Sequence, residues 1–298
     1  MWRRKLTAIA AAAALALGAL GGAAKAEITV GGKNFTEQLL LSEMTTIYLA
    51  EKGFEVEKRD GMGSTVLRRA QLNGQVDLYW EYVGTSLIVY NKVEDGASLP
   101  SDEAYAKVKE LDGEKGLVWL EPSDANNTYA LAMRAEQSEE MGIDTISEFV
   151  ARVENEGDLT LATNSEWAGR PDGLPGLQEH YDFRMSRADL KRMQTGLVYT
   201  ALKEGQVDVG LVFATDGRIA AFDFDVLEDD KGFFPSYDLT PVVREDTLEA
   251  NPKLRGHMNT LSSKLDSETM RTLNQRVDVD KETIEAVAED FLKNEGLI

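Results

Sequence analysis

Residues 70–82 read AQLNGQVDLYWEY, and residues 201–213 repeat the pattern as ALKEGQVDVGLVF. Each stretch predicts a helix, a glycine that ends it, and a strand that finishes on an aromatic residue, Tyr82 or Phe213. The offset of 131 residues between them is far longer than a solenoid repeat. Two lobes that each carry one copy would explain the repeat, although GQVD also serves as a common turn from helix to strand.

The segments around the repeat alternate between short β-rich runs and helical patterns. Residues 27–32 (EITVGG) predict a strand, and a helical pattern begins near Thr36. This alternation is typical of a largely parallel α/β fold. Ligands of such sheets bind beyond the carboxyl ends of the strands, so we expect Tyr82 and Phe213 to face each other across one cleft.

The first 26 residues have the features of a cleaved signal peptide. A basic stretch (residues 3–5), an apolar run (6–20) and the small-x-small pattern of residues 24–26 place the cleavage before Glu27. A membrane anchor is the alternative, but fifteen apolar residues are fewer than the roughly 20 that span a bilayer. No cysteine occurs, which excludes a lipoprotein anchor and disulfides. The sequence therefore predicts a free protein in the periplasm.

The mature chain is strongly acidic. Removal of the four basic residues in the leader leaves 28 of the 32 basic residues against 52 acidic ones, a net charge of −24. Such a surface repels nucleic acid and anionic lipid, so neither is an expected partner. It favours solubility and a ligand that is not an anion.

Catalysis has little support in the sequence. The only two histidines, His180 and His257, lie 77 residues apart and neither has the spacing of a metal site. No G-x-S-x-G nucleophile elbow occurs. We therefore predict a binding protein that is not an enzyme and has no cofactor or metal, with a periplasmic hydrolase of choline esters as the rival class.

Three tyrosines stand at loop-like junctions, where they can line a pocket. They are Tyr82, Tyr129 and Tyr237. Singly, each is more often a core residue with a satisfied hydroxyl. Together they can hold a cation that donates no hydrogen bonds, because a trimethylammonium group binds to aromatic ring faces.

Several motifs in fixed order resemble one family. They are residues 33–38 (KNFTEQ), 77–85 (DLYWEYVGT), 127–129 (NTY), 170–174 (RPDGL), 215–218 (TDGR) and 229–235 (DDKGFFP). The sequence is similar, from Ile28 to about Asp246, to the glycine betaine/choline/proline betaine-binding proteins of osmoprotectant ABC importers.

The resemblance implies a type II periplasmic-binding fold, in which two α/β lobes joined by two crossovers close on the ligand. Lobe 1 is expected to comprise residues 27–122 and 226–298, and lobe 2 residues 123–225. The crossovers are expected near residues 122–125 and 222–227. The resemblance also implies delivery of a quaternary-ammonium ligand to an inner-membrane permease driven by a cytoplasmic ATPase. A monomer is the default expectation for the oligomeric state.

The resemblance further implies which residues bind the ligand. An aromatic box would hold the ammonium, and basic and polar groups would hold the carboxylate. The box residues are Tyr82, Tyr129, Phe213 and Tyr237, and the carboxylate contacts are Lys33, Arg170 and Thr85. Asn127 is also expected to line the site. Phe213 stands where many relatives have tyrosine, and Asn127 where some carry aspartate. The alternative ligand is therefore another small cation or an amino acid, with weak affinity for betaine.

Overall fold

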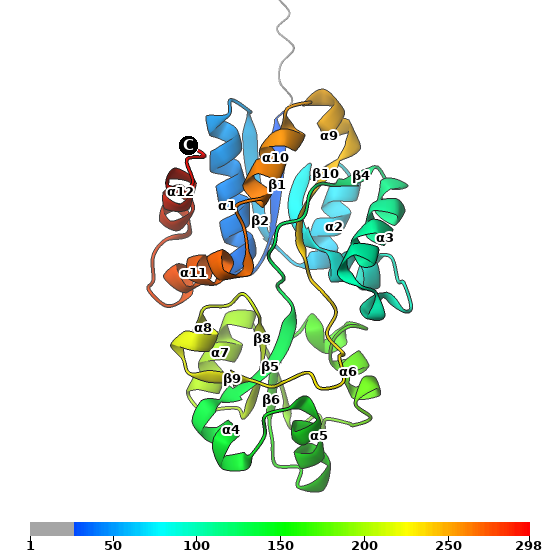
Figure 1. Cartoon of the computed structure of the whole chain (residues 1–298), viewed down its shortest axis with the longest axis vertical. Helices are drawn as coiled ribbons and strands as arrows, with labels where there is room; N and C mark the ends of the chain where they lie inside the picture. The colour runs from blue at the N-terminus through cyan, green and yellow to red at the C-terminus, as the bar shows by residue number, and fades with distance from the viewer. Residues whose placement is uncertain (1–26) are drawn as a thin grey trace, which may run out of the picture.

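The chain folds into two α/β bodies that lie one above the other in Figure 1, each built around a five-stranded sheet. The computed structural model describes residues 27–298, so the predicted signal peptide, residues 1–26, lies outside the described residues. The α/β class predicted from the sequence is confirmed.

The first body has the strand order β2-β1-β3-β10-β4. Strands β1, β2 and β3 run parallel, and β10 runs antiparallel to β3 and β4. Its strands are β1 (Ile28–Lys33), β2 (Val56–Met62), β3 (Leu78–Tyr82), β4 (Leu117–Trp119) and β10 (Leu239–Arg244). Its helices are α1 (Thr36–Glu51), α2 (Ser64–Leu72), α3 (Ser101–Gly113), α9 (Glu245–Ala250), α10 (Leu254–Ser262), α11 (Ser267–Asp278) and α12 (Ile284–Asn294).

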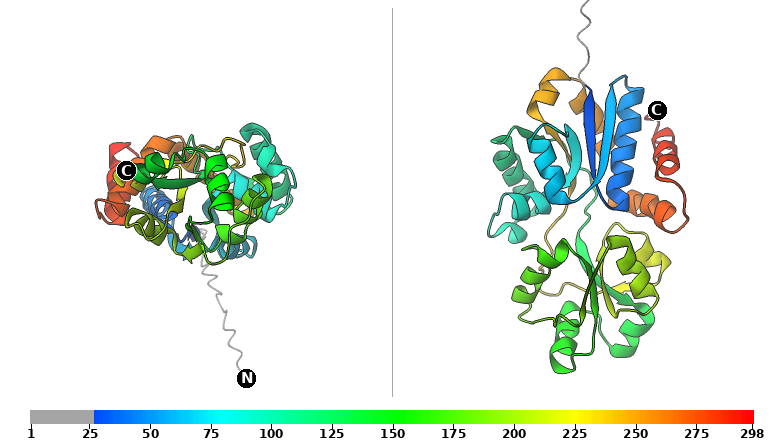
Figure 2. Two further views of the ribbon diagram at one scale, coloured as in Figure 1. Left: turned by 90° about the horizontal axis from the view of Figure 1, so that it is seen from below. Right: turned by 180° about the vertical axis from the view of Figure 1, so that it is seen from behind.

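Helix α1 and strand β3 supply much of the core of the first body. Leu40, Leu41 and Met44 of α1 are fully buried at the spacing of one helical face. Helix α1 packs between the sheet and α12, and the view from behind in Figure 2 shows the C-terminal helices beside it. All five residues of β3 are buried, as is typical of a central strand that is covered on both sheet faces.

The second body has the strand order β7-β6-β8-β5-β9. Its strands are β5 (Tyr129–Arg134), β6 (Leu161–Asn164), β7 (Leu190–Met193), β8 (Val209–Phe213) and β9 (Phe224–Val226). Its helices are α4 (Ala135–Met141), α5 (Ile146–Asn155), α6 (Leu174–His180), α7 (Thr195–Lys203) and α8 (Arg218–Ala221). The parallel strands β7, β6 and β8 correspond to β2, β1 and β3, and the antiparallel β5 corresponds to β10.

The two GQVD copies have the same backbone conformation and the same aspartate hydrogen bond in the two bodies. Gly74 and Gly205 both end a helix in the left-handed region, with φ of 71° and 70°. Three residues later, Asp77 accepts a hydrogen bond from the backbone N–H of Thr29 at 2.7 Å. Asp208 accepts the equivalent bond from Thr160 at 2.8 Å. The repeat therefore marks a β-α-β unit in each body, rather than an isolated turn.

We expect the Asp208→Ala substitution to lower the free energy of unfolding by about 1–3 kcal/mol, because it leaves the strand-start N–H and the hydroxyl of Thr160 without their acceptor. Burial raises the pKa of Asp208, but hydrogen bonds from Thr160 and Gln137 outweigh burial and lower it overall. This contribution is therefore present above a pH of about 4 and is lost as the pH falls through the lowered pKa.

Urea unfolding of Asp208→Ala and of the exposed control Glu140→Ala, at pH 7 and at pH 3, measures this contribution. Glu140 lies on the solvent side of α4 and is exposed. Equal stability of the two variants at pH 7 would contradict the assigned role of Asp208.

Two chain segments connect the bodies and run side by side. The N–H of Asn127 donates to the carbonyl of Tyr237 at 3.1 Å, and the N–H of Leu239 donates to the carbonyl of Ala125 at 2.9 Å. The first segment passes through the predicted crossover at residues 122–125. The second passes later than the predicted 222–227, at residues 235–239.

The reason for the later crossing is strand β9. Val226, the first residue assigned to the second segment of lobe 1, pairs with Ala132 of β5 in the second sheet. The carbonyl of Glu228 then accepts a hydrogen bond from Ile146, at the start of α5. The predicted boundary at residue 226 therefore divides a stretch that remains bonded to the second body.

Candidate functional site

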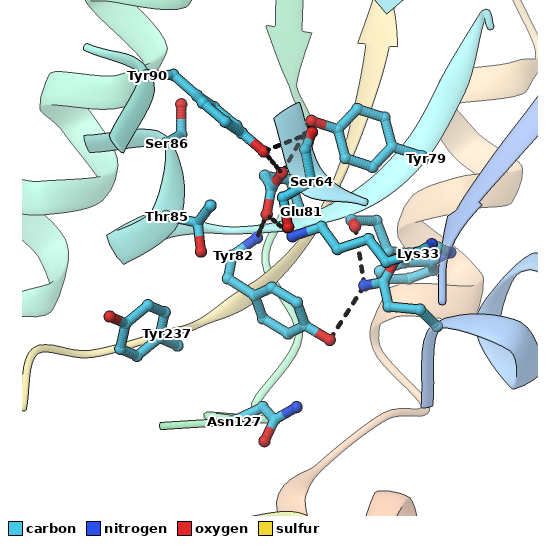
Figure 3. Close-up of polar contacts among 12 residues, drawn as sticks. Lys33, Ser64, Tyr79, Glu81, Tyr82, Thr85, Ser86, Tyr90, Asn127 and Tyr237 are labelled. Carbon is cyan, nitrogen blue, oxygen red and sulfur yellow. Dashed lines mark hydrogen bonds and ion pairs between the residues drawn. The ribbon is translucent and has the colours of Figure 1, made fainter. Parts of the chain in front are cut away.

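A cavity of about 790 Å³ lies between the two bodies, at the carboxyl ends of several strands. Lys33 ends β1, Tyr82 ends β3 and Phe213 ends β8, so the topology brings both sheets to one space. The cavity wall includes all eight site residues predicted from the sequence: Lys33, Tyr82, Thr85, Asn127, Tyr129, Arg170, Phe213 and Tyr237. Figure 3 shows Tyr82, Thr85, Asn127 and Tyr237 around this space.

Five aromatic rings form one connected cluster at the cavity. The Tyr129 ring lies 5.0 Å from Phe213 and 5.1 Å from Tyr237, between centroids. Phe35 stacks on Phe213 at 5.5 Å and on Tyr82 at 6.3 Å. Phe35 also lines the cavity, but sequence reasoning did not select it as a site residue. Its position two residues after the end of β1, in the KNFTEQ motif, was the available signal.

The hydroxyl groups of the three tyrosines are fixed by hydrogen bonds. The Tyr82 hydroxyl donates to Glu37 at 2.7 Å, and the Tyr237 hydroxyl donates to Asp172 at 2.6 Å. The Tyr129 hydroxyl accepts from Arg170 at 3.3 Å. Burial raises the pKa of each tyrosine, so all three are neutral. Their ring carbons are left to form the wall.

Arg170 presents one edge of its guanidinium group to the cavity. Asp172 takes the other edge, because Nε donates to Asp172 at 2.8 Å and Nη2 also pairs with that carboxylate. On the cavity side, Nη2 donates to the hydroxyl of Thr85 at 3.2 Å, and Nη1 donates to Tyr129 and Glu166, both at 3.3 Å. These three longer bonds are the ones that an incoming carboxylate can replace.

Lys33 is committed to a buried carboxylate in the first body. Its ammonium pairs with Glu81 and lies 4.6 Å from the centroid of the Tyr82 ring. Glu81 is fully buried and also accepts hydrogen bonds from Tyr79 at 2.9 Å and Tyr90 at 3.1 Å (Figure 3). The sequence therefore placed Lys33 at the cavity, but did not identify the partner that balances its charge.

The four predicted rings, Tyr82, Tyr129, Phe213 and Tyr237, are called the aromatic cage below. Asn127 lies between this cage and a second buried acid, Glu37. Its side-chain amide donates to Glu37 Oε1 at 2.7 Å. Its Oδ1 atom is buried and has no hydrogen-bond partner among the described residues. Burial raises the pKa of Glu37, although hydrogen bonds from Thr215, Tyr82 and Asn127 oppose this shift. Asn127 thus carries no charge itself but contacts an acid directly.

Ring faces and a guanidinium edge in one cavity suit a ligand that carries a positive and a negative group. The two histidines do not contribute to this cavity. His180 contacts the carbonyl of Lys231, and His257 packs against the Tyr48 ring; neither lines the cavity. Within residues 27–298, no three His, Cys, Asp or Glu side chains are grouped so that they could hold a metal ion.

The chain also matches known proteins along nearly all of its length. Residues 26–294 match the family described as the substrate-binding domain of ABC-type glycine betaine transport systems. The chain belongs to this family. It is the substrate-binding component of an ABC importer, and the recognition made from the sequence motifs is confirmed.

Named relatives agree with this family of binding domains. The chain is 44% identical over 285 residues to a glycine-betaine-binding protein of Pseudomonas aeruginosa, covering 93% of this chain and 91% of the relative. It is 30% identical over 280 residues to the glycine betaine-binding protein YehZ of Escherichia coli, covering 92% of each.

Solved structures confirm the type II binding-protein fold of this betaine-family domain. A crystal structure described as a glycine betaine/carnitine/choline ABC transporter superposes with a TM-score of 0.72 at 27% identity, covering 91% of this chain and 99% of that chain. Binding proteins of this family work outside the cytoplasm. Residues 27–298 contain no helix with the length and apolar character that a membrane crossing requires.

Proposed function

We propose that the cavity binds a zwitterion made of a quaternary ammonium and a carboxylate, with glycine betaine as the first candidate. The observation that carries this proposal is the five-ring cluster beside the guanidinium edge of Arg170. Ring faces attract a cation that donates no hydrogen bonds, and Arg binds a planar carboxylate with two N–H groups.

In this proposal the two charges of the ligand separate along the cavity. The trimethylammonium group contacts Tyr82, Tyr129, Phe213 and Tyr237. The carboxylate takes the Nη1 and Nη2 edge of Arg170 and the hydroxyl of Thr85. Lys33 adds a buried ammonium to the cavity wall, but its charge is paired with Glu81, so Arg170 is the main carboxylate contact. Asn127 supplies a polar wall through Oδ1, the acceptor that lacks a partner among the described residues.

The two bodies are proposed to act as lobes that close on the ligand. Thr85 of the first body already accepts a hydrogen bond from Arg170 of the second, and a carboxylate bound to both would strengthen this contact. The later second crossing supports lobes of residues 27–124 with 237–298, and 125–236. The function is reversible capture without turnover.

The compartment and partners follow from the same proposal. The chain is released into the periplasm by cleavage before Glu27 and acts as a monomer. It delivers its ligand to an inner-membrane permease that a cytoplasmic ATPase drives. The acidic surface of the mature chain, with 28 basic and 52 acidic residues and a net charge of −24, keeps the protein away from anionic lipid while it diffuses.

Titration calorimetry with glycine betaine, proline betaine, choline and glycine tests the ligand class. We expect saturable binding of the betaines at one site per chain. Glycine carries the same carboxylate but a strongly hydrated primary ammonium, so we expect it to bind far more weakly than glycine betaine. Absence of heat for all three quaternary ammonium compounds at millimolar concentrations would refute the proposal.

The same titrations separate the alternative ligand class. Choline has the ammonium but no carboxylate, so preferential binding of choline would point to a small cation as the ligand. Preferential binding of an amino acid with a primary ammonium would point to hydrogen bonding rather than the rings. Hydrolysis of a choline ester by the pure protein would instead indicate an enzyme.

A further inference from the structure

A buried carboxyl group lies directly behind the aromatic cage, outside the main cavity. Glu37, in the first turn of α1, is 3% exposed. It lines a small separate space of about 20 Å³, which is closed on the cage side by Phe35 and Phe213. This space is too small for a ligand of the size proposed above, so Glu37 acts on the site only through its neighbours.

Glu37 accepts four hydrogen bonds, two on each oxygen. Oε1 accepts from the Tyr82 hydroxyl and from the Asn127 amide, both at 2.7 Å. Oε2 accepts from the Thr215 hydroxyl at 2.5 Å and from the Asn274 amide at 3.3 Å. One oxygen therefore holds two residues of the cavity wall, and the other holds residues behind it.

The donors come from both bodies. Tyr82 ends β3 in the first body, whereas Thr215 follows β8 in the second. Asn274 of α11 strengthens the same junction, because it also donates to the carbonyl of Thr215 at 2.9 Å. Opening of the cleft would separate Thr215 from both Glu37 and Asn274, while Tyr82 would keep its bond to Glu37.

We propose that Glu37 is a positioning residue for the aromatic cage and that its bond to Thr215 holds the two bodies together around the ligand. This inference rests on the proposed function. One carboxylate fixes the Tyr82 ring and Asn127 on one side of the cage. Through Thr215, it draws the loop that follows Phe213 toward them, so the cage is complete only when the bodies are close.

A favourable interaction with the dipole of α1 does not account for these contacts. A carboxylate in the first turn of a helix interacts favourably with the helix dipole even when it is exposed to solvent, so this interaction does not require burial. Burial of a carboxyl costs free energy unless hydrogen bonds compensate it. Four donors that converge from two bodies provide this compensation, and they do so only in the closed arrangement.

The variants Thr215→Val and Glu37→Gln test the inference, with Ser42→Ala as the control. Thr215→Val removes one hydroxyl and keeps the shape of the side chain. Ser42 is a buried serine of α1 whose hydroxyl bonds only within the first body, to Leu39 and Asp60. Titration calorimetry, thermal unfolding and small-angle X-ray scattering of the ligand-free proteins are measured for all four chains.

We expect Thr215→Val and Glu37→Gln to raise the Kd for glycine betaine about tenfold each, the usual effect of losing one hydrogen bond to a charged group. The Kd for choline should rise by the same factor, because the ammonium site is disturbed and the carboxylate site is not. The radius of gyration should increase without ligand. Ser42→Ala should change neither the Kd values nor the radius.

Unchanged affinity and unchanged scattering in both variants would overturn the inference, even if their melting temperatures fall, because a purely structural role predicts that result. If the wild type binds no quaternary ammonium compound, the proposed function fails by itself. The scattering comparison then decides the inference alone, since expansion of Thr215→Val relative to Ser42→Ala requires no ligand.

Discussion

The Arg170→Ala variant is expected to bind glycine betaine at least about 100-fold more weakly than the wild type, whereas choline should lose only a few-fold. Arg170 offers Nη1 and Nη2 to the cavity, and choline has no carboxylate to use them. Titration calorimetry with both ligands measures the difference. Equal losses for the two ligands would contradict the assignment of Arg170 to the carboxylate.

The control for Arg170→Ala must separate the loss of ligand contacts from the loss of the partner of Asp172. Its side chain is fully buried and pairs with Arg170, so removal of the arginine leaves a buried charge with the Tyr237 hydroxyl as its remaining partner. Loss of one member of a buried pair costs about 3–5 kcal/mol of stability. The double variant Arg170→Ala with Asp172→Asn removes this charge. It should recover stability but not the affinity for glycine betaine.

The positions of Tyr82 and Phe213 could be predicted because backbone topology decides them, and the other site residues were predicted from the motifs that resemble the family. Tyr82 and Phe213 end the two strands of the internal repeat, and parallel α/β sheets place such ends around one cleft. The repeat, the strand ends and the motifs can all be recognised in the sequence itself. All eight predicted residues line the same cavity, the two strand ends and the six residues taken from the family motifs alike.

The partners of these residues could not be predicted in the same way. Glu81 lies one position before Tyr82 in a strand whose five residues are all buried, so strand alternation does not show that its carboxylate meets Lys33. Glu37 and Thr215 are 178 residues apart and meet only where the two bodies adjoin. Such contacts depend on side-chain directions across a junction, which periodicity does not encode.

The second crossing was placed too early for a similar reason. Strand β9 has three residues, and two of them are exposed at the edge of the sheet. A segment so short shows no alternation, and its pairing with β5 depends on the tertiary fold.

Tyr129→Ala should weaken glycine betaine and choline alike, by about 100-fold each. The Tyr129 ring is the centre of the cage, since it contacts Phe213 and Tyr237 and is 8% exposed. A desolvated ring face contributes up to about 2 kcal/mol to cation binding, and truncation of a central aromatic also admits water. Calorimetry with both ligands checks the prediction.

The matched control is Tyr129→Phe, which keeps the ring and removes only the hydroxyl that accepts a 3.3 Å hydrogen bond from Arg170. We expect it to cost less than about tenfold, because that bond is long and an incoming carboxylate can replace it. Phe213 already shows that a cage wall of this chain is built without a hydroxyl. If Tyr129→Phe were as damaging as Tyr129→Ala, the hydroxyl rather than the ring face would be the binding group, and the cage would have to be abandoned in favour of a hydrogen-bonded ligand.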